Sequence, residues 1–184
     1  MREIFRRQLA DYANYHRDPR NCAMHVVGNP ILFLAAVLPL SSLPVTAFGL
    51  QANMAVLLVM PALIVWIVLD LTIGLAIVAA AVPLLSIAAM IAGHVSVAWV
   101  WTITAGLVVI GWALQIVGHL MFEHRRPALL DNPIHMLMSP MFVFAKLFVA
   151  FGFRRDLAAV LRNPSQPMSR GSPLHETADR ARLG

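Results

Sequence analysis

The long interval between His25 and Glu123 carries a single formally charged side chain, that of Asp70. Hydrocarbon penalises every unpaired charge, so a stretch this long and this poor in charge is typical of membrane-embedded helices. The whole chain is 59% hydrophobic and 12% charged, with a mean hydropathy of +0.74, whereas soluble domains contain about 25% charged residues. The sequence therefore predicts a polytopic membrane protein, and its 184 residues have room for one membrane bundle without a separate soluble catalytic domain.

Polar turns divide the apolar residues into four predicted spans, at about 26–48, 54–69, 73–92 and 97–118. A helix needs about 20 residues to cross about 30 Å of hydrocarbon, and the second span is short for this. A fifth apolar stretch, 134–153, contains Lys146 and precedes Arg154, so we expect a re-entrant or surface-lying amphipathic segment there. The expected fold class is an all-α, polytopic membrane helical bundle of about four transmembrane helices. Residues 1–162 are expected to form the catalytic bundle, and 163–184 a disordered tail.

The basic side chains flank the apolar spans, in a chain whose net charge is +5 and whose pI is near 10.7. The arginines beside the predicted spans are Arg2, Arg6, Arg7, Arg17, Arg20, Arg125, Arg126, Arg154 and Arg155. This placement is typical of the positive-inside rule and of contact with anionic membrane lipid, and it argues against a nucleic-acid partner. We therefore expect a multi-pass integral membrane protein whose arginine-flanked face is cytoplasmic. The membrane would be the inner membrane of a bacterium or the endoplasmic reticulum of a eukaryote.

Two polar segments, 15–25 and 119–127, border the apolar region. An even number of crossings brings the chain back to the side where it started, so with four crossings both segments emerge on the same face. The two polar segments can therefore meet. His94 follows the third span on the opposite face, and this position excludes it from a site that both segments form.

Local spacing indicates which side chains of these segments converge. His119 and Glu123 are four residues apart, so on a helix they project from one face, as two ligands of one metal ion require. Asp18 followed by proline has the form of a helix N-cap and first turn. A helix break at that point lets both His16 and His25 turn inward.

Neutral imidazoles together with a carboxylate suit either zinc or non-haem Fe(II), and the ligand types leave both open. Asn21 lies one turn before His25 and could orient its ring or face a substrate. His124 points about 100° away from Glu123 on a helix and is left outside the site. Cys22 is the only cysteine, which excludes a thiolate cluster. Because the site lies at the mouth of a lipid-embedded bundle, a long-chain lipid substrate is favoured.

Many residues of the polar segments also match a known pattern. They are Tyr15-His16, Asn21, His25, Gly28 and Pro30 in the first, and Gly118-His119, Phe122-Glu123, Arg125-Arg126-Pro127-Ala128-Leu129, Asp131-Asn132 and Pro140 in or beyond the second. On these residues the chain resembles the 2-hydroxy fatty acid dioxygenase family of fatty-acid α-oxidation, over about residues 8–153. The resemblance implies an Fe(II)-dependent membrane dioxygenase. Such an enzyme would use O₂ to shorten a long-chain 2-hydroxy fatty acid by one carbon, giving a fatty aldehyde.

The resemblance also implies roles for individual residues. The candidate metal ligands are His16, His25, His119 and Glu123. Glu123 could instead be a base that orients a histidine. The candidate catalytic residues are Tyr15, Asn21 and Glu123, and the candidate substrate-binding residues are Arg125, Arg126 and Asn132.

Two other classes of protein stay open at this point. A histidine-box lipid hydroxylase or desaturase uses larger clusters of histidine, and this chain has only seven histidines in all. A non-enzymatic alternative is a small transporter or a haem-binding bundle, in which His25 and His119 would be axial ligands or members of a proton relay.

Overall fold

The structure is a computed structural model that describes residues 3–47, 49–124 and 134–162. Its elements follow one another as α1 (Glu3–Asn14), α2 (Pro19–Ser41), β1 (Pro44–Ala47), β2 (Leu50–Asn53), α3 (Met54–Leu69), α4 (Leu71–His94), α5 (Val97–Val117), the π-helix η1 (Gly118–Glu123), α6 (Ile134–Ala150) and α7 (Arg155–Arg162). The predicted all-α membrane bundle is confirmed, with one small hairpin added. The expected disordered tail, 163–184, lies outside the described residues.

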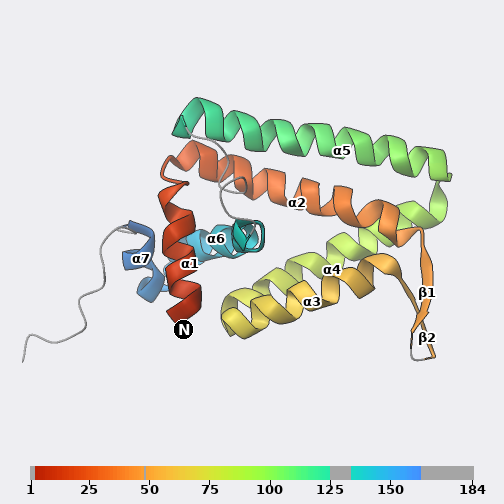
Figure 1. Cartoon of the computed structure of the whole chain (residues 1–184), viewed down its shortest axis with the longest axis horizontal. Coiled ribbons are helices and arrows are strands. Elements are labelled where there is room, and N and C mark those ends of the chain that lie inside the picture. Colours follow the sequence, from red (N-terminus) through yellow and green to blue (C-terminus); the bar gives the residue numbers. More distant parts are fainter. Residues whose placement is uncertain (1–2, 48, 125–133, 163–184) are drawn as a thin grey trace, which may run out of the picture.

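Four apolar helices form the long body of the molecule, and successive helices run in opposite directions along it (Figure 1). Among the described residues, three straight segments are long and apolar enough to cross a membrane: α2 with 23 residues, α4 with 24, and α5 continued by η1 with 27. α3 is also apolar but has 16 residues, which span about 24 Å as a helix. It packs against α4 as the short member of an antiparallel pair.

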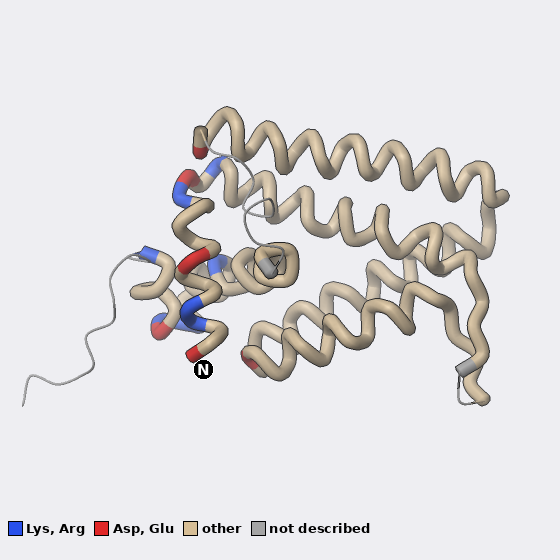
Figure 2. The backbone as a smooth tube through the Cα atoms, viewed as in Figure 1, with Lys and Arg blue, Asp and Glu red and all other residues tan. Residues whose placement is uncertain are grey.

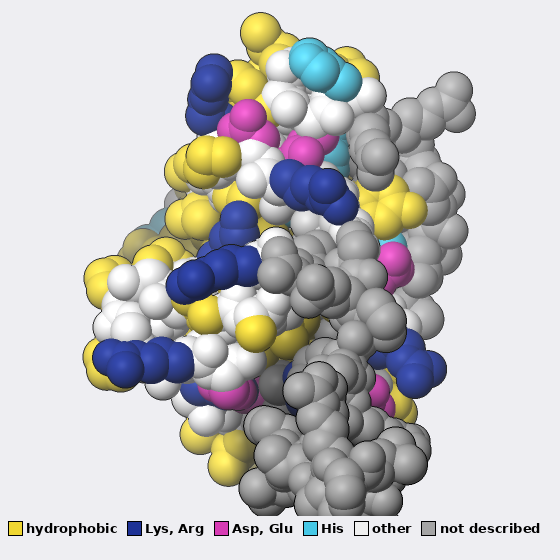
Figure 3. Space-filling model, turned by 90° about the vertical axis from the view of Figure 1, so that its left-hand side faces the viewer, with side chains coloured by type: hydrophobic (Ala, Val, Ile, Leu, Met, Phe, Trp, Pro, Cys, Tyr) yellow, Lys and Arg dark blue, Asp and Glu magenta, His cyan; other side chains and the backbone are white. Residues whose placement is uncertain are grey.

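The charged side chains gather at one end of the bundle (Figure 2). That end holds α1, α7, the start of α2, the α3–α4 turn and the end of η1 (Figure 1). A view onto it shows basic and acidic side chains interspersed with apolar ones (Figure 3). Both polar segments therefore reach the same end, as the crossing argument predicted, whereas α4 carries His94 to the other end.

The first apolar span differs from its predicted limits of 26–48. The predicted N-cap at Asp18 is confirmed, so α2 already begins at Pro19, and the helix continues through Pro30 and Pro39 to Ser41. Membrane helices tolerate such prolines because neighbouring groups satisfy the freed carbonyls. Residues 44–53 then form an antiparallel hairpin in which Pro44 pairs with Asn53, and Gly49 has the positive φ of 78° that favours glycine.

The segments at the two ends of the chain pack together beside this body. α1, which the sequence did not predict, is an amphipathic helix that buries Phe5, Leu9 and Tyr12 in a core shared with Phe142 of α6 and Leu157 of α7. α6 and α7 meet at a bend of 117°, which is the shape of a re-entrant loop or a broken span. The bend fits the re-entrant segment expected at 134–153 and fits a broken span as well, so whether this stretch crosses the membrane stays a prediction.

Asp70, the one charged residue of the apolar region, links the packed helices α1, α6 and α7 to the four-helix body. Its carboxylate is buried and accepts two hydrogen bonds from the Arg154 guanidinium, at 2.9 and 3.0 Å, and one from the backbone N–H of Ile73. Burial alone would raise the pKa of Asp70, but these hydrogen bonds outweigh it and hold the pKa below its usual value. The pair therefore clamps the α3–α4 turn to the α6–α7 bend.

Replacing Asp70 with asparagine is expected to destabilise the fold by about 2 kcal/mol, because Arg154 is left half-buried with only Asp156 as its acidic partner. The wild-type pair stabilises the fold above about pH 4, and this contribution disappears as the pH falls through the lowered pKa of Asp70. Thermal unfolding in detergent between pH 3 and 7 measures both effects, and D70N should lack the acid-dependent loss.

The matched control for this prediction is Asp156→Asn, which removes the more exposed acid on the same guanidinium and should cost less. Equal unfolding midpoints for D70N and the wild type at neutral pH would contradict the role given to the clamp.

Candidate metal centre

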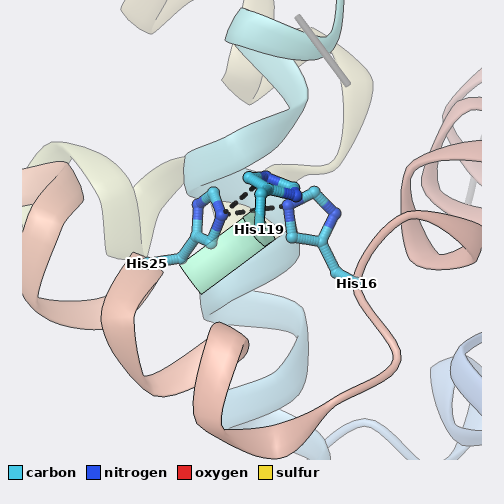
Figure 4. Close-up of side chains that lie close together, drawn as sticks. All are labelled: His16, His25 and His119. Atoms are coloured by element: carbon cyan, nitrogen blue, oxygen red, sulfur yellow. Dashed lines mark hydrogen bonds between the residues drawn. The ribbon is translucent and has the colours of Figure 1, made fainter. Parts of the chain in front are cut away.

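Three buried imidazoles meet at the charged end of the bundle (Figure 4). Nε2 of His16 lies 3.0 Å from Nε2 of His25, which in turn lies 3.3 Å from Nε2 of His119. One ligand nitrogen from each ring lies within 4.8 Å of the others, and each residue is at most 4% exposed. The three histidines that the sequence proposed as ligands are therefore brought together.

The hydrogen bonding of these rings fits a bound cation. Nδ1 of His16 donates to the carbonyl oxygen of Tyr12 at 3.0 Å, so in the neutral ring Nε2 carries the lone pair. Nε2 of His25 faces the nitrogens of both other rings, and one proton cannot satisfy both contacts. A metal ion that accepts all three lone pairs can. Nitrogens bound about 2.1 Å from one ion lie about 3.0 to 3.4 Å apart, and the contacts of His25 with His16 and with His119 have this spacing.

His16 is held between the end of α1 and the start of α2. Its ring stacks on Tyr12 with centroids 4.1 Å apart, and the Phe142 ring lies 5.3 Å away. Burial, followed by the neighbouring His25 and His119 rings, lowers the pKa of His16 far below its ordinary value, against the opposing hydrogen bond to Tyr12. The imidazole is therefore neutral at physiological pH, which is the form that binds metal.

His119 reaches the cluster from η1, the π-helical turn that ends α5. Single π-helical turns are rare and often lie at functional sites. Gly118, next to His119, lets this turn approach α2 closely, because a Cβ there would overlap Oδ1 of Asn21. No signal in the sequence predicted the π-helix, and the close approach places His119 opposite His25.

Glu123 joins the two polar segments but is not a member of the three-histidine cluster. Its Oε1 accepts hydrogen bonds from the backbone N–H of Asp18 at 2.9 Å and from Nδ2 of Asn21 at 3.1 Å. A carboxylate at the start of α2 is also favoured by the helix dipole. The structure thus brings Glu123 and Asn21 together beside the histidines, with the Asn21 side chain fully buried.

The remaining predicted site residues have different positions. Tyr15 is half-buried, and its ring lies 5.5 Å from the ring of His135, whereas Tyr12 is the tyrosine stacked on His16. The candidate substrate-binding residues Arg125, Arg126 and Asn132 lie outside the described residues. His124, which the sequence argument left out, is exposed and ends η1 in a left-handed conformation with φ of 52°.

Three residues near the centre were missed from the sequence. Tyr12 supports His16, and His135 is buried beside Tyr12 with its Nε2 2.8 Å from Oδ2 of Asp11. Lys146 lies 2.9 Å from Sγ of Cys22. For His135 and Lys146, the available sequence signal was a polar side chain within an apolar stretch. That signal by itself does not reveal which residue the side chain contacts.

A buried polar network lies one helical turn beyond His25. Nδ2 of Asn29 donates to Oγ of Ser139 at 2.9 Å, and Nε2 of Gln115 donates to Oδ1 of Asn29 at 2.8 Å. These contacts join α2, α5 and α6 inside the bundle. Such hydrogen bonds satisfy groups that lipid could not solvate, so they fix how the three helices pack beneath the histidines.

Comparisons with known proteins identify the family of this chain. A family model described as "2-hydroxy-palmitic acid dioxygenase Mpo1-like" matches residues 2–151, which include all three histidines. The chain is 32% identical over 160 residues to "2-hydroxy-palmitic acid dioxygenase MPO1" of Saccharomyces cerevisiae, covering 86% of this chain and 87% of that protein. No solved structure matches it. The chain therefore belongs to the 2-hydroxy-palmitic acid dioxygenase Mpo1-like family, as the resemblance of its two polar segments predicted.

Proposed function

We propose that this chain is an integral-membrane, Fe(II)-dependent dioxygenase that uses O₂ to shorten a long-chain 2-hydroxy fatty acid by one carbon. One observation carries the proposal: three buried imidazoles turn their Nε2 atoms toward one point in a chain of this family. The name of the yeast relative supports the class of substrate.

His16, His25 and His119 are the residues that would hold the metal. Three nitrogen ligands leave coordination positions open, which a reaction with O₂ and substrate needs. Iron(II) bound there would supply redox chemistry with O₂. Zinc would not, because it has no second accessible oxidation state. Three neutral ligands also leave the positive charge of a divalent ion uncompensated, so an anionic substrate is favoured beside it.

The work of the protein is to orient the imidazoles and to exclude water. The Tyr12 carbonyl fixes the tautomer of His16, and the rings of Tyr12 and Phe142 cover it. Glu123 keeps the start of α2 against η1, so His25 and His119 stay opposite each other. We assign it a positioning role, and its place as a fourth ligand rests on sequence spacing alone. The roles given to Tyr15, Asn21, Arg125, Arg126 and Asn132 likewise remain proposals.

The location of the centre suits an amphiphilic substrate. His16 lies just before α2, His25 lies in its first turns and His119 lies in η1, at the end of the bundle where charged residues gather (Figure 2). A carboxylate can therefore stay near the interface while the acyl chain lies along apolar helices. By the positive-inside rule, this arginine-rich end would face the cytoplasm, across a bacterial inner membrane or the endoplasmic reticulum.

The balance of atoms and electrons distinguishes two possible products. Oxidation of a 2-hydroxy acid to the shortened aldehyde and CO₂ removes two electrons, so one O₂ leaves as H₂O₂. Oxidation to the shortened acid and CO₂ removes four electrons, so the two oxygen atoms enter the acid, CO₂ and water. The aldehyde is the product that the resemblance implies, and its balance requires H₂O₂ as co-product, with neither atom of O₂ kept in the aldehyde or in CO₂. A dioxygenase that keeps both atoms in its products requires the four-electron balance and the shortened acid, so release of H₂O₂ and incorporation of isotopically labelled O₂ distinguish the two.

The geometry argues against a haem-binding bundle. Two axial histidines approach a haem iron from opposite faces of the macrocycle. Here the nitrogens lie side by side at 3.0 and 3.3 Å, with no room for a ring system between them. Purified protein is expected to show no Soret band.

Replacing His119 with alanine should lower bound iron and turnover by more than about 100-fold, because one of three protein ligands is lost. Iron is measured by elemental analysis of detergent-purified protein, and turnover by consumption of O₂ with a long-chain 2-hydroxy acid. His94→Ala removes an exposed histidine at the far end and should change neither quantity. Full iron content and turnover in H119A would remove the centre from the proposal.

Replacing Glu123 with glutamine should weaken iron binding by about 10-fold, since the amide keeps the shape but is a weaker acceptor for Asp18 and Asn21. Competition with a chelator measures the affinity, and His124→Ala is the matched control on the adjacent exposed residue. A loss as large as that of H119A would show instead that Glu123 is a ligand.

A further inference from the structure

We propose that the ammonium group of Lys146 binds the carboxylate of the substrate beside the metal centre, and hence that the enzyme selects a free 2-hydroxy acid over its esters. The inference rests on the proposed function and identifies the chemical form of its substrate. It assigns a binding role to a residue outside both polar segments.

Lys146 lies on the α6 side of the centre and shares two neighbours with His16. Its Nζ is 2.9 Å from Sγ of Cys22, and that sulfur is 3.6 Å from the carbonyl oxygen of His16. Nζ is also 5.2 Å from the centroid of the Phe142 ring, which lies 5.3 Å from the His16 ring and 5.1 Å from the Tyr12 ring. The ammonium therefore shares the thiol with the backbone of His16 and shares the Phe142 ring with its imidazole.

The charge of Lys146 has no acidic counterpart in the part of the chain that the structure describes. The residue is half-buried, and no described carboxylate lies within ion-pair distance of its Nζ. Its contacts are a thiol and the face of a ring, which stabilise a cation but do not neutralise it. A cation placed this way in a membrane bundle is costly, so it is expected to serve an anion.

A lysine at position 146 suits the binding of a carboxylate. Lys146 is the only lysine among fourteen lysine and arginine residues in the chain. An ammonium is a compact point charge on a flexible stem, whereas a guanidinium is a wide planar fork. An ammonium has three N–H donors, so one that contacts Cys22 keeps others for a carboxylate.

The ligand that such a site recognises has three parts: a carboxylate, an adjacent hydroxyl and an apolar chain. The ammonium receives the carboxylate, and the adjacent hydroxyl turns toward the three-histidine centre, which shares Cys22 and Phe142 with the ammonium. Esterification would remove the negative charge and leave the ammonium without its partner. The free acid is therefore the form that the site favours.

The test compares wild-type protein with Lys146→Met, which keeps the length of the side chain without the charge. Equilibrium binding of a long-chain 2-hydroxy acid and of its methyl ester is measured without O₂, and turnover is then measured with O₂. K146M is expected to weaken binding of the acid by about 10- to 100-fold and to raise its KM similarly. Affinity for the ester and the iron content should stay unchanged.

Two further variants keep this test decisive. Lys146→Arg retains the charge in a wider head, so it should bind the acid more tightly than K146M but less tightly than the wild type, and it serves also if K146M does not fold. Arg155→Met removes a cation from the exposed surface of α7 and should leave acid binding unchanged. Unchanged acid affinity and KM in K146M, with the same preference for acid over ester as the wild type, would overturn the inference. Lysine-dependent acid binding in wild-type protein that consumes no O₂ would support this site and defeat the dioxygenase proposal.

Discussion

The hydrogen bonds of Glu123 join two polar segments that lie about one hundred residues apart in the chain. Its carboxylate bridges the backbone of Asp18 and the side chain of Asn21, and so holds the end of η1 against the start of α2. His25 lies one turn beyond Asn21, and His119 precedes Glu123 by four residues. The meeting of the imidazoles therefore depends on this contact, in a region where lipid offers no competing partner for a polar group.

Several other polar groups of the bundle also fix contacts between helices. Asp70 and Arg154 clamp the terminal helices to the α3–α4 turn. Asn29 and Ser139 join α2 to α6 beneath the histidines. Lys146 differs from them, because among the described residues its charge meets only a thiol and an aromatic face. This charge without an acidic partner is the basis of the binding role proposed for Lys146.

The sequence predicted the helices wherever local signals were strong. It failed where the limits or the existence of a helix depend on its surroundings in the fold. α3 begins and ends where the polar residues Asn53 and Asp70 predicted, because both side chains cap helices. The first span was misplaced at both ends, because α2 already begins at the Asp18 cap within the polar segment and gives way after Ser41 to a hairpin that hydropathy does not distinguish from a span. α1 was missed because a short, charged amphipathic helix is stable only when its apolar face has a partner.

By itself, the sequence determined that the chain is a membrane bundle, that both polar segments lie at one end of it, and that three histidines belong to one centre. Hydropathy and the number of crossings suffice for this, because the cost of charge in lipid fixes which residues can lie inside. Only the tertiary structure decided that Glu123 binds the start of α2, that Tyr12 rather than Tyr15 supports His16, and that Lys146 approaches the centre. These contacts depend on a π-helical turn and on the crossing of α6 over α2, and neither leaves a periodic signal in the sequence.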